Sequence, residues 1–263
     1  MKSECTISTV LPEPPESLDF PGPTPSDPVI SSLSRSRAAA EVLICSGYPT
    51  QLLIIAALGS VGIRPGADGT LSPAFIFGIS ALDTVLLLSL VFFFLRRSND
   101  RPRDVFLKHQ RATDEIRLGL MLVPVIFLTV VVVQLGIRVI APLLHNVEVS
   151  PFQSLLASPW LLAGFVALVL VAGGVREELQ RAFLLHRFEQ RLGGGSLGVA
   201  LTSLAFGLGH TVQGWDAAIV TALMGAFWGV LYLSRRSVVS TITNHAVFNV
   251  TQIVLGYATL ARA

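Results

Sequence analysis

Apolar residues form long runs along this chain, and short polar connections separate the runs. Seven runs are roughly 15 to 25 residues long, the length that an α-helix needs to cross a hydrocarbon core about 30 Å thick. They begin near Tyr48, Pro73, Leu118, Pro159, Leu197, Asp216 and Val238. The pattern therefore predicts seven transmembrane helices, or eight if the region from Ala38 to Ile63 holds a longer helix broken around Pro49.

The composition points to the same class of protein. Of the 263 residues, 52% are hydrophobic and 14% are charged, and the mean hydropathy is +0.66, which is too apolar for a soluble domain of this length. Because irregular backbone cannot face lipid, we expect an all-α polytopic membrane protein, a helical bundle of seven to eight transmembrane helices. The net charge of +2 does not suggest a nucleic-acid partner. The two cysteines, Cys5 and Cys45, form no recognisable disulfide framework or metal motif.

The first 35 residues differ from the rest of the chain. They contain seven of the fifteen prolines, interleaved with Ser, Asp and Glu, and no apolar run. This composition predicts a disordered tail over residues 1–35. The tail lacks the positive start and the apolar stretch of a signal peptide, so we expect it to remain in the mature protein. The remainder divides into N-terminal transmembrane helices, 36–150, and a core, 151–263, that carries most of the polar residues found within apolar runs.

Basic residues concentrate in three connections. These are the stretch 95–117, the stretch from Arg176 to Arg191, and the pair Arg235 and Arg236. The connections around 66–72, 145–150 and 211–215 carry few basic residues. Because loops rich in Lys and Arg stay in the cytoplasm, we expect an integral protein of the cell membrane with its N-terminal tail and basic loops on the cytoplasmic side.

Four groups of polar residues lie within apolar runs, where ionisable side chains are costly and are functional candidates by default. They are Glu177, Glu178 and Arg181; His210; His245 and Asn249; and Asp83. For Asp83 we favour a structural hydrogen bond or a helix-end cap. For the other three groups, the alternatives to a functional role are surface salt bridges, a histidine at the far membrane interface, and interhelical hydrogen bonds without chemistry.

Counting residues from the basic turns places three of these groups at similar depth. If the helix that starts near Pro159 continues to about Arg191, Glu177 lies 14 residues from its end, or about 21 Å. His210 lies 14 residues after Ser196, where the next helix is expected to begin, again about 21 Å. On the same rise per residue, His245 and Asn249 lie about 12 Å and about 18 Å from the turn at 235–237. The three helices thus bring their polar groups into one layer.

Helical spacing gives each group a common face. Residues four apart stack on one side of a helix, as do Glu177 and Arg181, Phe206 and His210, and His245 and Asn249. We therefore expect Arg181 to be the partner of Glu177, which avoids leaving one buried charge uncompensated.

These residue types together can catalyse the hydrolysis of a peptide bond or another acyl bond. A glutamate facing a histidine in a protected cavity can hold and deprotonate a water molecule. A second histidine beside an asparagine offers donors to the oxyanion that forms when water attacks a carbonyl. The arginine would fix and partly neutralise the second glutamate. Two histidines and a glutamate are also a familiar zinc set, but the spacing is not HExxH, so we expect no metal cofactor and keep a divalent metal as the alternative.

The motifs resemble those of the CPBP intramembrane proteases, which include the type II CAAX prenyl endopeptidases and Abi-like proteins. The family pattern is E-E-x-x-x-R, then F-x-x-x-H, then H-x-x-x-N, on successive membrane helices. Phe206 to His210 matches the second motif, and His245 to Asn249 matches the third. The resemblance covers roughly residues 155–255. It implies that the first glutamate and the first histidine activate water, and that the later His and Asn form the oxyanion site.

The first motif departs from the family pattern by one position. Counted from Glu177 and Glu178, the arginine is expected at Ala182, but it is Arg181. Aligned on Arg181, Glu177 becomes the second glutamate and Arg176 takes the place of the first. We expect Glu177 to be the base, with Glu178 as the other candidate; true loss of the first glutamate would mean a pseudoenzyme.

The resemblance implies an intramembrane endopeptidase that cleaves a membrane-embedded or lipidated peptide substrate. A second hypothesis is a non-catalytic membrane scaffold or immunity-type protein that uses the same polar layer to hold its helices together. A transporter ranks last, because a transport pathway needs polar residues through the full depth of the membrane. Apart from Asp83, the polar residues within the apolar runs of this chain cluster in one layer.

Overall fold

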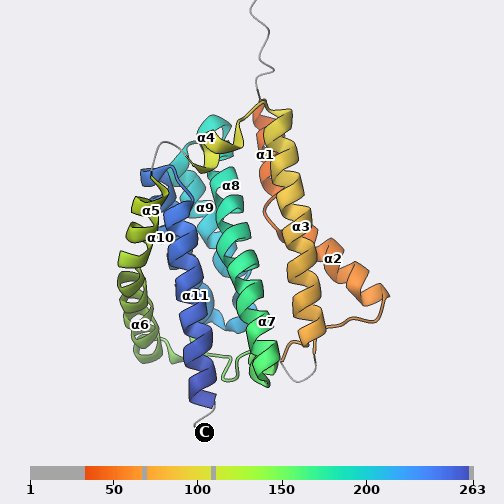
Figure 1. The fold of residues 1–263 in the computed structure, drawn as a ribbon, viewed down its shortest axis with the longest axis vertical. Helices are drawn as coiled ribbons and strands as arrows, with labels where there is room; N and C mark the ends of the chain where they lie inside the picture. Colours follow the sequence, from red (N-terminus) through yellow and green to blue (C-terminus); the bar gives the residue numbers. More distant parts are fainter. Residues whose placement is uncertain (1–32, 67–69, 108–110, 261–263) are drawn as a thin grey trace, which may run out of the picture. The chain divides into compact units, whose positions relative to one another are not determined.

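The computed structural model describes residues 33–66, 70–107 and 111–260, which form helices joined by short connections (Figure 1). The α-helices are α1 (Arg35–Ile44), α2 (Tyr48–Ser60), α3 (Pro73–Arg97), α4 (Pro102–Phe106), α5 (Ala112–Met121), α6 (Val123–Ile140), α7 (Pro159–Val169), α8 (Glu177–Arg191), α9 (Gly195–Leu208), α10 (Trp215–Arg235) and α11 (Val239–Leu260). A π-helical segment, η3 (Leu170–Arg176), joins α7 to α8, and short 3-10 turns are η1 (Pro142–Leu144), η2 (Gln153–Leu156) and η4 (Thr211–Gln213).

The predicted all-α fold is confirmed. In the part of the chain that the structure describes, β-pairing is limited to one isolated bridge between Leu107 and Ser237. The predicted tail, 1–35, lies outside the described residues except for 33–35, where α1 begins at Arg35.

Each predicted apolar run forms a helix. Among the described residues, five helical stretches are long and apolar enough to cross a membrane: Arg35–Ser60, Pro73–Arg97, Ala112–Ile140, Pro159–Arg191 and Trp215–Arg235. The stretch Gly195–Leu208 is apolar but shorter. The first stretch is broken, in agreement with the alternative of a helix interrupted near Pro49: Gly47 separates α1 from α2 with a φ of 93°, and Pro49 lies in the first turn of α2. The protein is an all-α polytopic membrane protein.

The helices that carry the polar groups pack against one another. In Figure 1, α8 runs between α3 and α11, α5 and α6 lie on the other side of α11, and α9 and α10 lie behind. The helix α9 packs against both α8 and α10, while α11 packs against α5 and η3.

Two glycines permit the close approach of α11 to η3. A Cβ atom on Gly173 would lie 2.9 Å from Nδ2 of Asn249, and one on Gly174 would lie 3.0 Å from the Cβ of Ala246. Small residues allow helix backbones to approach closely in membranes, where interhelical packing replaces the hydrophobic effect. The Gly173–Gly174 pair therefore brings α11 next to the first turn of α8.

A buried ion-pair network holds the far end of α8. The Arg187 side chain is 0% exposed; its Nε donates to Glu41 of α1 at 2.6 Å, and its Nη1 donates to Asp100 after α3 at 2.6 Å. Partial burial raises the pKa of Asp100, but hydrogen bonds and charges from His186 and Arg187 outweigh it and lower that pKa from 3.8 to about 2. The stability that Asp100 contributes is therefore complete above about pH 4 and is lost as the pH falls through about 2.

Removal of this buried cation is expected to destabilise the bundle. In Arg187→Met, Glu41 keeps a buried charge that has lost one of its two arginine partners, and such losses cost about 3–5 kcal/mol. The measurement is thermal unfolding in detergent. The control is Arg191→Met, because Arg191 ends the same helix and is exposed. Equal unfolding temperatures for the two variants would contradict the structural role of Arg187.

Candidate functional site

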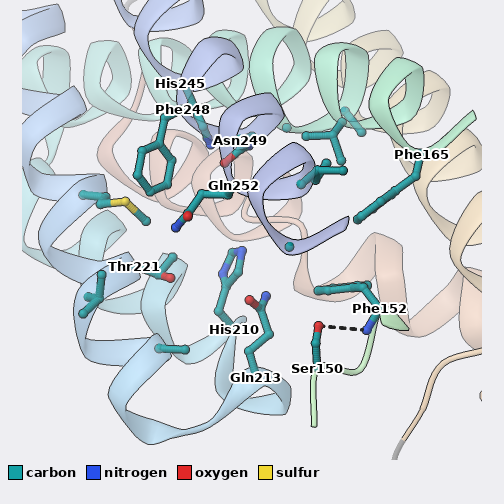
Figure 2. A pocket seen from close by; sticks show the side chains of 18 of the residues that line it. Ser150, Phe152, Phe165, His210, Gln213, Thr221, His245, Phe248, Asn249 and Gln252 are labelled. Atoms are coloured by element: carbon teal, nitrogen blue, oxygen red, sulfur yellow. Dashed lines mark hydrogen bonds between the residues drawn. The ribbon is translucent and has the colours of Figure 1, made fainter. Parts of the chain in front are cut away.

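A cavity of about 760 Å³ lies among α3, α6, α7, η3, α9, α10 and α11. Figure 2 shows His210 on one side of this cavity and His245, Asn249 and Gln252 of α11 on another. Glu177 also lines the cavity. Four of the six predicted site residues, Glu177, His210, His245 and Asn249, therefore border one space inside the bundle.

Glu178 points away from this space into the helix interface. Its side chain is 1% exposed; Oε1 forms an ion pair with Arg181 and lies 2.8 Å from Nδ1 of His245. Because a carboxylate can only accept, Nδ1 of His245 carries the proton in this hydrogen bond. Glu178 thus joins α8 to α11.

The expected pairing of Arg181 with Glu177 is wrong. Arg181 pairs with Glu178 instead. This is possible because side chains three residues apart on a helix are neighbours, just as those four residues apart are. The expectation that the arginine neutralises the second carboxylate agrees with this contact.

Glu177 is the carboxylate that borders the cavity. Its side chain is 17% exposed, and its Oε2 lies 3.8 Å from Nε2 of His245. Its Oε1 lies 3.9 Å from Nη1 of Arg176. The two neighbouring glutamates therefore have different surroundings: one is enclosed by ionic partners, and the other faces open space.

His245 is held on three sides. The two carboxylates lie at its two ring nitrogens, and the Trp228 ring stacks on it at 3.7 Å between centroids with an angle of 16° between planes. Trp228 is fully buried, and its indole N–H donates to Oδ1 of Asn244 at 2.8 Å. The hydrogen bond to Asn244 holds the Trp228 indole in place, and the stacking on Trp228 fixes the plane of the His245 imidazole ring.

His210 lies just beyond its helix. We expected it on the helix itself, but α9 ends at Leu208 and His210 precedes η4, since its backbone N–H bonds to Gly207 three residues back. Glycines at 207 and 209 favour this early end because they are poor helix formers. Its Nδ1 lies 2.7 Å from the carbonyl oxygen of Phe206, so Nδ1 is the donor and Nε2 of the neutral ring is an acceptor.

Asp83 has the structural role that we favoured. It accepts a hydrogen bond from Oγ1 of Thr50 at 2.7 Å and forms an ion pair with Nη2 of Arg176 at 3.0 Å. Arg176, which takes the place of a glutamate when the first motif is aligned on Arg181, is therefore neutralised by a carboxylate from α3.

The sequence analysis missed the residues that orient His245. Asn244 is a polar residue in the same apolar run, and this signal could have singled it out. Trp228 gives no comparable signal, because a tryptophan in an apolar run can equally face lipid. Over the described ranges, no group of three or more His, Cys, Asp and Glu side chains is arranged to hold a metal ion.

Residues 158–251 match the family model described as type II CAAX prenyl endopeptidase Rce1-like. The match begins just before α7 and includes all six predicted site residues. No curated protein and no solved structure matches the chain. The segment that carries the polar layer therefore matches the Rce1-like family of type II CAAX prenyl endopeptidases, which confirms the resemblance that its motifs indicated.

Proposed function

We propose that this protein is an intramembrane endopeptidase in which Glu177 and His210 activate a water molecule. The observation that carries the proposal is that both residues line one cavity with His245 and Asn249, inside a segment of a peptidase family. The substrate is a membrane-embedded or lipidated peptide, since the cavity lies within the helical bundle.

The reaction follows from the acceptors and donors around the cavity. Glu177 takes a proton from water, with Nε2 of His210 as the second acceptor, while the water oxygen attacks the peptide carbonyl carbon. The amide of Asn249 and, when protonated, Nε2 of His245 donate to the oxyanion. The C–N bond then breaks, and Glu177 passes its proton to the leaving amine.

Glu178 and Arg181 act on this reaction through His245. The hydrogen bond from Nδ1 fixes the ring so that Nε2 faces the cavity and Glu177. The positive charge of Arg181 balances Glu178, which leaves Glu177 as the carboxylate free to exchange a proton with water. We further propose that the basic loops lie in the cytoplasm.

Substitution of the residues that activate water or stabilise the oxyanion should abolish cleavage. Glu177→Gln, His210→Ala and His245→Ala should each lower kcat at least about 100-fold, as expected for loss of general base or oxyanion groups, with normal membrane insertion. The measurement is cleavage of a panel of membrane-anchored peptides by protein in liposomes. The matched control is Glu148→Gln, the same change in an exposed residue that lines the same cavity.

Retained activity in Glu177→Gln would exclude Glu177 as the base, and retained activity in Glu178→Gln as well would exclude a glutamate base at this site. The second candidate function, a non-catalytic scaffold, is favoured by one observation. When the first motif is aligned on Arg181, Arg176 occupies the position of the first glutamate of the family pattern. The scaffold function predicts that the wild-type protein cleaves no peptide while the same substitutions lower stability.

Gly173→Ala should damage the oxyanion site without unfolding the protein. The added Cβ would lie 2.9 Å from the amide end of Asn249, which is flexible enough to move away. A shift of about 1 Å in a catalytic group can cost on the order of 100-fold in rate, so we expect kcat to fall about 10- to 100-fold. The control is Gly136→Ala, where a Cβ meets nothing within 4 Å. Full activity of Gly173→Ala would show that the position of Asn249 is unimportant.

We also propose that no metal ion takes part. Cleavage by the purified protein should then be unchanged after treatment with a metal chelator. Loss of activity on chelation, restored by one added divalent ion, would replace the proposal by a metal-dependent reaction.

A further inference from the structure

The turn that carries His210 is short and connects α9 to α10. Within it, the backbone N–H of Gln213 donates to the carbonyl oxygen of His210 at 2.9 Å, and that of Gly214 donates to Thr211 at 3.0 Å. Because these hydrogen bonds join residues 210–214 into one unit, the position of His210 depends on how the two ends of the turn are held.

Helix packing holds the first end of the turn. A Cβ atom on Gly207 would lie 2.5 Å from the carbonyl oxygen of Ala218 and 2.7 Å from the Cβ of Ala222. The last turn of α9 therefore lies directly against the first turns of α10, an approach that small residues allow. This packing restrains the residues before His210.

Two consecutive residues of the α6–α7 connection hold the second end. Nδ1 of His145 lies 2.7 Å from Oδ2 of Asp216, and Oδ1 of Asn146 accepts the backbone N–H of Trp215 at 3.0 Å. A carboxylate can only accept, so Nδ1 of His145 is the donor in the first of these hydrogen bonds. The start of α10 is thus tied to a segment about 70 residues earlier in the chain.

Asp216 is a buried carboxylate, only 3% exposed. Its Oδ1 accepts the backbone N–H of Ala217 at 2.9 Å, and its place in the first turn of α10 lets the helix dipole stabilise its charge. Among the described residues, His145 is the side chain that forms an ion pair with it. Loss of His145 would leave the buried carboxylate with backbone partners alone, which is costly.

The α6–α7 connection is itself anchored at its other end. The backbone N–H of Leu71, just before α3, donates to the carbonyl oxygen of Pro151 at 2.8 Å, and Oγ of Ser154 donates to the carbonyl oxygen of Leu71 at 2.6 Å. Figure 2 shows that Phe152 of this connection and His210 border the same cavity. The connection is therefore a fixed support for the turn.

We propose that His145, Asn146 and Asp216 are positioning residues, which hold the turn so that Nε2 of His210 stays at the cavity wall. This inference rests on the proposed endopeptidase function. His145 and Asn146 precede residues 158–251, so a segment outside the family match contributes to the site. Because a shift of about 1 Å in a catalytic group can cost on the order of 100-fold in rate, these contacts act on kcat.

The test removes one contact at a time. His145→Leu removes the donor to Asp216, whereas His145→Asn keeps a side-chain N–H near the place of Nδ1. Asn146→Ala breaks the bond to Trp215 from an exposed position, in case His145→Leu folds poorly. The matched control is His186→Leu, the same change at a histidine whose Nε2 lies 3.3 Å from Asp100, near the end of α8.

His145→Leu should lower kcat at least about 10-fold and Asn146→Ala at least about threefold, with KM changed less than about twofold. His145→Asn should stay within about threefold of the wild type, and His186→Leu should match it. Unchanged kcat in folded His145→Leu and Asn146→Ala would overturn the inference, as would an equal loss in His145→Asn or His186→Leu. Absence of cleavage of every peptide by the wild type would overturn the proposed function.

A second readout observes His210 without cleavage. The ring nitrogens are followed by NMR on protein labelled with ¹⁵N-histidine, and the His210 signals are those lost in His210→Ala. In the wild type the neutral ring should carry its proton on Nδ1, which donates to Phe206. His145→Leu should give a mixture of the two tautomers, and His186→Leu should not. Identical His210 signals in His145→Leu and the wild type would overturn this inference alone.

Discussion

The hydrogen bond from His245 to Glu178, together with the Glu178–Arg181 ion pair, is the interaction on which the rest of the site depends. It joins α8 to α11 inside the bundle with a carboxylate that is almost fully buried. A buried carboxylate is tolerable only when its charge and its hydrogen-bonding capacity are satisfied, so this contact fixes the relative position of the two helices. Because Glu178 is committed to this role, Glu177, its neighbour in sequence, is left at the cavity wall.

The backbone around this contact is built for close approach. The π-helical segment ends directly before Glu177, and wide helical turns of this kind occur frequently at functional sites. Gly173 and Gly174 lie in the same segment and leave space for Asn249 and Ala246 of α11. The glycines and the contacts of Glu178 thus act on the same interface, the one with α11. The glycines leave out side chains that would hold the helices apart, and Glu178 adds a specific attraction to His245.

Much of the fold and part of the site were predictable from sequence. The helices α2, α3 and α7 begin at the residues from which the apolar runs were counted. Long apolar runs are a clear signal in a membrane protein, because the thickness of the bilayer sets their length. The continuation of the helix past Val175 to Arg191 was also predicted correctly. The partner of Arg181 was not, since spacings of three and four both place residues on one helix face. The stacking of Trp228 on His245 and the burial of Arg187 depend on contacts between distant helices, which periodicity along one helix does not reveal.

The most direct test of the central claim, that Glu177 faces the reacting bond while Glu178 only orients His245, is an experimental structure with a peptide phosphinate, which mimics the tetrahedral intermediate. The account predicts one phosphinate oxygen within hydrogen-bonding distance of His245 and Asn249, and the other near Glu177 and His210. It also predicts that Glu178 still contacts Arg181 and does not touch the inhibitor. A phosphinate bound to Glu178, or bound away from Glu177, would contradict the account.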